Sequence, residues 1–123
     1  MNPSIEWQCV SLDWSRKLKA LGVPQESAFY WCESEMGGMS VQIIGVNGFG
    51  KEHAHFSAFT VAELGEMLPD FTVCRKGVDA HAWQIECNGN DWSAMRKEPT
   101  EANARAAMLC HLIESKIINP SGG

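Results

Sequence analysis

The sequence predicts an α+β fold, an antiparallel sheet of about five strands with three helices mainly on one face, in the order α-β-β-α-β-β-β-α. One observation behind this prediction is the length of 123 residues, which fits one domain with its own hydrophobic core. A second is the composition, 45% hydrophobic and 20% charged, which is close to the average of globular proteins. A third is that strand-like segments follow one another instead of alternating with helices, which favours antiparallel pairing.

The first helix is expected over residues 12–21. Ser11 can cap its first turn. Apolar side chains recur along it at helical spacing, namely Trp14, Leu18 and Leu21. Gly22 ends this helix, since glycine readily adopts the backbone conformation that follows a last helical turn.

Two strands and a long irregular segment are expected next. Residues 28–33 are rich in aromatic side chains, which favour strands, and residues 40–46 are expected to pair with them as a hairpin. Residues 47–59 contain two glycines and two of the four histidines, and we expect them to form a loop. Loops of this length in small domains frequently carry function.

The second half of the chain is expected to add strands between two further helices. Thr60 and Glu63 form a capping-box pattern, which predicts a helix that ends at Pro69. Turn-forming sequences then separate three strand-like segments. These segments are residues 71–75, 80–87 and 92–96.

The last helix is expected to begin after Thr100, which can cap it. Its apolar stripe at helical spacing consists of Ala102, Ala106, Leu109, Ile113 and Ile117. The small alanines would let this helix lie close to the sheet. Residues 1–118 are therefore expected to form a single α+β domain, followed by a C-terminal tail over residues 119–123.

The charge balance bears on the class of partner. Ten Lys and Arg residues stand against fifteen Asp and Glu residues, which gives a net charge of −5. A protein that binds duplex nucleic acid normally presents a basic face, whereas short clusters such as Arg75-Lys76 and Arg96-Lys97 are interpreted as solvated surface. No stretch approaches the roughly 20 apolar residues of a membrane span, and no signal peptide is recognised. We therefore expect an intracellular protein that contacts neither duplex nucleic acid nor a membrane.

Three segments of the chain are familiar from another group of proteins. They are residues 18–31 (LKALGVPQESAFYW), 59–69 (FTVAELGEMLP) and 100–109 (TEANARAAML). These segments resemble small phage and prophage proteins that have no assigned activity. The resemblance implies a phage accessory protein in the cytoplasm of the bacterial host, with interference with a defence system as a natural role. It carries over no catalytic residue.

The reactive side chains lack visible activating neighbours. His53 and His55 can aim both rings at one zinc ion, but the other Cys and His residues are spaced unfavourably for a four-ligand site. None of the five cysteines lies at an expected helix N-terminus, so we expect free thiols that are not activated. The sequence thus predicts no catalytic residue, no metal and no cofactor. The alternatives are a small metal-dependent hydrolase that uses His53 and His55, and a nucleic-acid-binding regulator whose affinity falls steeply with salt.

Aromatic and basic residues define the expected binding site. The chain has five Trp, one Tyr and five Phe residues, and Trp is enriched at protein interfaces. Because strand residues alternate between faces, some of these side chains are expected to point outward. The candidate ligand-binding residues are Tyr30, Trp31, Lys51, His53, His55, Arg75, Trp83 and Trp92. They predict a non-catalytic binding protein, expected to be a homo-oligomer, that blocks a host protein or sequesters a nucleotide-like small ligand.

Overall fold

The computed structural model describes residues 8–33, 38–42, 54–69, 72–76, 82–89 and 91–120. This part of the chain contains three helices and six strands. The helices are α1 (Leu12–Ala20), α2 (Val61–Met67) and α3 (Glu101–Glu114). The strands are β1 (Tyr30–Glu33), β2 (Met39–Gln42), β3 (Ala54–Ser57), β4 (Thr72–Lys76), β5 (Trp83–Asn88) and β6 (Ser93–Glu98). The predicted α+β class is confirmed.

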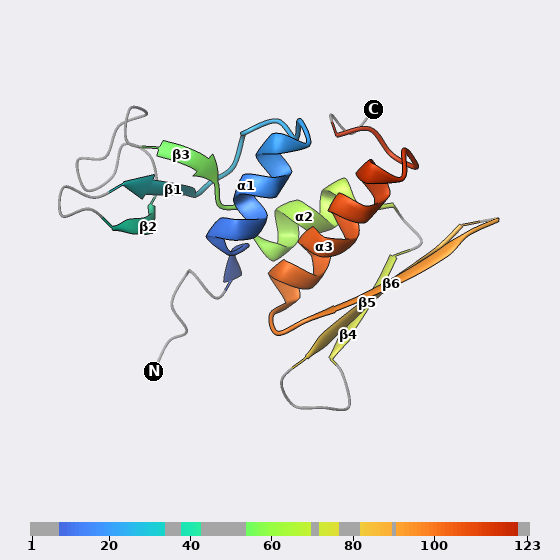
Figure 1. Ribbon diagram of the computed structural model, residues 1–123. Coiled ribbons are helices and arrows are strands. Elements are labelled where there is room, and N and C mark those ends of the chain that lie inside the picture. The colour runs from blue at the N-terminus through green and yellow to red at the C-terminus, as the bar shows by residue number, and fades with distance from the viewer. Residues whose placement is uncertain are drawn as a thin grey trace.

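The strands form two antiparallel sheets, where the sequence predicts one sheet of about five strands. The first sheet has the strand order β2-β1-β3 and the second has the order β4-β5-β6. The additional strand, β3, lies within residues 47–59, which the sequence predicts as a loop. Four residues are too few to show a clear alternation, so pairing with β1 decides this strand. In Figure 1 the two sheets lie on either side of the helices.

β1 is the central strand of the first sheet. Trp31 of this strand pairs with Val41 of β2 and with Phe56 of β3. The Trp31 side chain is buried, and its indole N–H donates to the backbone carbonyl of Val10 at 3.2 Å. The other buried members of this small apolar cluster are Cys9, Val41 and Ala58.

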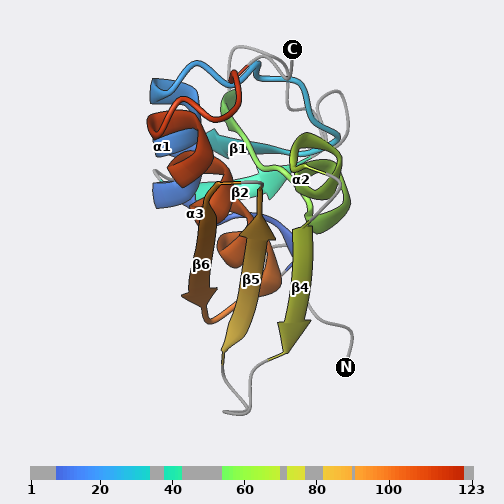
Figure 2. The same cartoon turned by 90° about the vertical axis from the view of Figure 1, so that its right-hand side faces the viewer.

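The two faces of the second sheet have different environments. β5 pairs with both β4 and β6, so rows of side chains run across all three strands. On the inner face, Ile85 and Cys87 are fully buried in the main core, the larger apolar cluster of the protein, which also contains Phe59, Leu64 and Leu112. Here α3 packs against β5 and β6. Figure 2 looks onto the outer face and shows the three strands in front of α3. Within the described part of the chain, no helix or strand covers this outer face.

α3 lies at the centre of the main core. The side chain of Thr100 accepts from the Asn103 N–H at 3.2 Å, which confirms the predicted cap. Ala102, Ala104 and Ala106 are fully buried, and small side chains allow neighbouring elements to approach closely. α3 contacts α1, α2, β5 and β6. None of the described helices is both long and apolar enough to cross a membrane.

Glu63 ties α2 to the segment that precedes β1. Its carboxylate accepts from the Thr60 N–H at 2.9 Å, and the Thr60 hydroxyl accepts from the Glu63 N–H, which confirms the predicted capping box. The same carboxylate accepts from the Ser27 hydroxyl at 2.8 Å and from the Ala28 N–H at 3.1 Å. One side chain therefore holds the start of α2 and the approach to β1 together.

Candidate functional site

The aromatic pair of β1 belongs to the framework of the first sheet. Trp31 is only 9% exposed, and its N–H is engaged by the Val10 carbonyl. The Tyr30 hydroxyl donates to the Gln25 carbonyl at 3.2 Å and accepts from the Ser27 N–H at 3.4 Å. The polar groups of both candidate residues are thus used within the chain.

The histidine part of the predicted site has no described geometry. Lys51 and His53 lie outside the described residues, and His81 does as well. His55 lies within β3, but its side chain is outside what the structure describes. The hydrolase alternative depends on His53 and His55, so it stays a hypothesis. Among the described residues, no three Cys, His, Asp or Glu side chains gather as metal ligands would.

Arg75, Trp83 and Trp92 do not meet in one site. Trp83 points to the inner face of the second sheet, where it is half-buried against the main core. Trp92 is also half-buried against this core. Arg75 lies opposite Gln84 on the outer face. Tyr30 and Trp31 lie in the other sheet. The described candidate residues therefore do not form one site.

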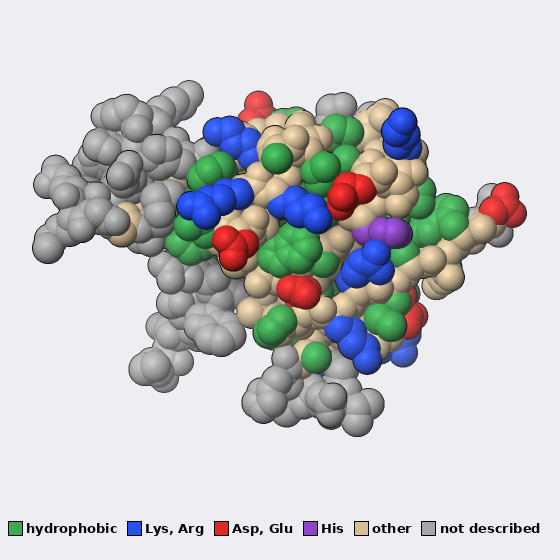
Figure 3. Space-filling view, in the orientation of Figure 1, with side chains coloured by type: hydrophobic (Ala, Val, Ile, Leu, Met, Phe, Trp, Pro, Cys, Tyr) green, Lys and Arg blue, Asp and Glu red, His purple; other side chains and the backbone are tan. Residues whose placement is uncertain are grey.

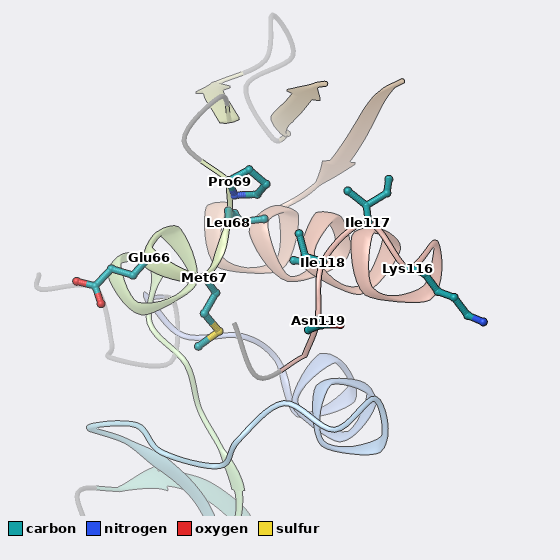
Figure 4. Close-up of a pocket in the computed structure, with 8 residues that line it drawn as sticks. All are labelled: Glu66, Met67, Leu68, Pro69, Lys116, Ile117, Ile118 and Asn119. Carbon is teal, nitrogen blue, oxygen red and sulfur yellow. The ribbon is translucent and has the colours of Figure 1, made fainter. Parts of the chain in front are cut away.

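A cavity of about 460 Å³ lies between the end of α2 and the segment that follows α3. Met67, Leu68 and Ile118 line it with apolar side chains. Glu66 and Lys116 lie at its two ends, and Figure 4 shows both charged groups directed away from it. The two charges therefore do not converge on a ligand in this cavity.

Another cavity, of about 480 Å³, lies beside the first turns of α2 and α3. It is lined by Gln8, Thr60, Val61, Ala62, Glu101 and Arg105. Arg105 donates two hydrogen bonds to one carboxylate oxygen of Glu101, at 2.7 and 3.1 Å, so the two charges are paired. Burial raises the pKa of the neighbouring Cys74 thiol, Glu101 raises it further, and Arg105 lowers it in part. A thiol with a raised pKa is a poor nucleophile at neutral pH.

Three buried thiols elsewhere in the chain are not activated either. Burial raises the pKa of Cys32. It also raises the pKa of Cys87, and the Thr72 hydroxyl offsets part of that rise. The pKa of Cys110 is raised to about 12 by burial. These thiols therefore act as small apolar side chains of the core.

The outer face of the second sheet combines exposed apolar and charged side chains. Val73 and Met95 are the large hydrophobic residues that the described part of the chain exposes, at 50% and 45%. They lie in one cross-strand row with Glu86 between them. The next row consists of Arg75, Gln84 and Lys97. These six residues are named the outer patch.

Glu86 is the hydrogen-bonding centre of the outer patch. The Arg75 guanidinium lies 3.3 Å from one Glu86 oxygen, and the Gln84 amide donates to the other at 2.6 Å. Lys97 is exposed and forms no ion pair with the residues that the structure describes. Two cations and one anion make the outer patch net positive in a chain of net charge −5. Over α1 and α3, in contrast, Figure 3 shows basic and acidic side chains interspersed.

Of the outer patch, only Arg75 is among the candidate residues predicted from the sequence. The available signal is the pair of basic dipeptides Arg75-Lys76 and Arg96-Lys97. The register of β5 with its two neighbours places Arg75 and Lys97 on either side of Gln84. In Arg96 the side chain instead points inward, where its guanidinium donates to Nδ1 of His111 at 2.7 Å. Adjacent basic residues therefore have different roles, which only the register shows.

No protein-family model, curated protein or solved structure matches the chain. The described structure defines a small α+β protein in which helices cover one face of the second sheet and leave the other open. The outer patch on that open face is the candidate functional site.

Proposed function

We propose that this protein is a non-catalytic binding protein that acts in the cytoplasm of a bacterial host and blocks a host protein through the outer patch. The observation that carries the proposal is the half-exposed pair Val73 and Met95 on an open sheet face. Apolar side chains that gather at the surface beside charged ones are typical of protein interfaces. A partner that covers these two side chains removes them from water, and this stabilises the complex through the hydrophobic effect.

Blocking a protein is favoured over sequestering a nucleotide-like ligand. Sequestration requires an aromatic ring and a cation in one concave pocket. Trp83 and Arg75 lie on opposite faces of the second sheet, and the cation of the 480 Å³ cavity, Arg105, is paired with Glu101. An exposed sheet surface suits a macromolecular partner better than a small ligand.

Two further observations support the proposal. Burial raises the pKa of the Cys32, Cys74, Cys87 and Cys110 thiols, which argues against nucleophilic catalysis by them. The resemblance of residues 59–69 and 100–109 to phage proteins favours a role in the infected cell. In that setting the proposed role is interference with a bacterial defence system.

Photocrosslinking in bacterial cells tests the proposed function. A photoreactive amino acid replaces Val73 or Met95 in separate variants. We expect both positions to form an adduct with the same host protein, because one partner covers both side chains. Ala20, which is exposed on α1, is the matched control position and should form no such adduct.

A second substitution makes this test specific. With the photoreactive group at Val73, Met95→Ser should reduce the adduct, since it removes apolar contact area from the same surface. Adducts of equal yield from Ala20 would contradict the proposal, and so would an adduct formed only with a second copy of the chain.

Metal analysis of the purified protein tests the hydrolase alternative. Stoichiometric zinc that is lost with His53→Ala and His55→Ala would favour this alternative over the proposed function.

A further inference from the structure

We infer that the outer patch binds an acidic amphipathic helix of the partner protein, laid across the three strands of the second sheet. The inference rests on the proposed function and specifies the chemistry of the partner at the same site. Its basis is the arrangement of the patch in two parallel rows. In the first row the apolar residues Val73 and Met95 lie on either side of Glu86. In the second row the basic residues Arg75 and Lys97 lie on either side of Gln84.

The spacing within each row matches a helix. Neighbouring strands lie about 4.8 Å apart, so side chains on β4 and β6 are separated by about 10 Å. This applies to Val73 and Met95 and equally to Arg75 and Lys97. A helix rises about 1.5 Å per residue, so residues i and i+7 of one stripe are also about 10 Å apart. A helix across the strands can therefore place apolar residues seven positions apart over Val73 and Met95.

The spacing between the rows also fits. Side chains on one face of a strand repeat about every 7 Å, and a helix with its side chains is about 10–12 Å across, so one helix can cover both rows. Carboxylates on the stripe beside the apolar one would then face Arg75 and Lys97. The Arg75 side chain is 60% exposed, and Lys97 has no ion-pair partner among the described residues. Both cations can accordingly meet a partner carboxylate.

Glu86 restricts what the centre of the partner helix can carry. Its oxygens already accept from Arg75 and Gln84, and its side chain is 32% exposed. An acidic residue opposite Glu86 would be repelled, whereas a small polar residue or a hydrogen-bond donor would not. The partner helix should therefore lack Asp and Glu at the middle of its apolar stripe.

The chemistry of the outer patch favours an acidic protein over a nucleic acid. Single-stranded nucleic acids bind by stacking their bases on aromatic side chains, and the six residues of the patch include none. Glu86 at the centre of the patch would repel a continuous row of phosphates. A helix with carboxylates only on the stripe beside its apolar stripe matches the two rows without this repulsion.

Titration with designed helical peptides tests the inference. The test peptide carries Leu at i and i+7, Ser between them and Glu along the adjacent stripe, and the control peptide has Lys in place of each Glu. We expect the acidic peptide to bind about tenfold more tightly, because exposed charge pairs of the right sign favour it. Raising the salt from about 50 mM to about 500 mM should remove most of this advantage by screening.

Matched variants locate the binding site. Lys97→Glu should weaken binding of the acidic peptide by about tenfold, and Lys97→Gln should have a smaller effect. Lys116→Glu makes the same change at an exposed lysine outside the patch and should change binding by less than about twofold. Circular dichroism of each variant confirms that it is folded.

Several outcomes would overturn the inference. Equal binding of the two peptides would do so, as would equal effects of Lys97→Glu and Lys116→Glu. Binding of a single-stranded oligonucleotide that Lys97→Glu abolishes would identify a nucleic-acid surface instead. If the peptides fail while Val73 and Met95 still crosslink to one host protein, the helix inference is wrong and the proposed function stands. If the peptides do not bind and neither Val73 nor Met95 crosslinks to a host protein, both the helix inference and the proposed function are wrong.

Discussion

At the scale of single residues, burial decides the role of side chains whose chemistry alone is ambiguous. Trp31 is a candidate ligand-binding residue from its sequence, yet the structure buries it and engages its N–H with the Val10 carbonyl. Cys32, Cys87 and Cys110 show the same effect, because burial in a medium of low polarity disfavours the charged thiolate and raises the pKa of each thiol. Met95 shows the opposite case, an apolar residue left at the surface.

Cys110 makes the cost of burying a thiolate measurable. It is 1% exposed, and burial raises its pKa from 9.0 to about 12. Because the folded-state pKa is raised, the contribution to stability is fully present below about pH 9 and is lost as the pH rises through about 12. We expect this group alone to lower the free energy of unfolding by about 1.4 kcal/mol per pH unit in that window.

Cys110→Ala checks this expectation by urea unfolding at a series of pH values. Near neutral pH the variant should be less stable by about 1 kcal/mol, because it leaves a small cavity. Above about pH 9, the free energy of unfolding of the variant should fall less steeply with pH than that of the wild-type protein. The reason is that the wild-type protein releases one more proton, that of Cys110, when it unfolds. Identical slopes would mean that the buried thiol ionises as easily as an exposed one.

At the scale of elements, helix ends follow from signals within a few residues, whereas strands depend on distant partners. Ser11, Thr60 and Thr100 each accept from a backbone N–H three residues later, as predicted. The strands predicted at 71–75, 80–87 and 92–96 are present as β4, β5 and β6. The sequence predicts a loop where β3 lies, because the conformation of β3 is set by its pairing with β1.

The end of α3 offers a test at this scale. Lys116 follows the last turn with a φ of 61°. Its N–H donates to Ile113, and the next N–H, of Ile117, donates to Leu112, which is the Schellman pattern. A side chain in the left-handed region is strained by about 1 kcal/mol, and glycine is not.

Lys116→Gly should therefore raise the free energy of unfolding by about 0.5–1 kcal/mol. Lys116→Ala removes the same charge and keeps Cβ, so it should give no such gain. Urea denaturation of the two variants and the wild-type protein measures the difference. Equal stabilisation by both substitutions would assign the effect to the lysine side chain and not to the backbone.

At the scale of the whole molecule, the helices join the two sheets. α3 packs against the second sheet and against α1, and α1 in turn contacts β3 of the first sheet. Glu63 adds hydrogen bonds between α2 and the segment before β1. We therefore expect both sheets to unfold in one transition.

Leu112→Ala tests this coupling. Leu112 is fully buried in the main core, so the substitution should lower the free energy of unfolding by about 2–5 kcal/mol. Hydrogen exchange under increasing denaturant should show β1 and β5 losing protection together in this variant. Met95→Ala, on the outer patch, is the exposed control and should change stability by less than about 0.5 kcal/mol. Loss of protection in β5 alone would show that the sheets unfold separately.

The α+β class, the three capped helices and the negative net charge follow from the amino-acid sequence alone, because these features depend on composition and on contacts between near neighbours. The division of the strands into two sheets, and the placement of Arg75 and Lys97 beside Val73 and Met95 on one open face, are seen only in the folded protein. The reason is physical: a shift of one residue in pairing moves every side chain of a strand to the other face. That register is set by hydrogen bonds between segments far apart in the chain, so no local pattern contains it.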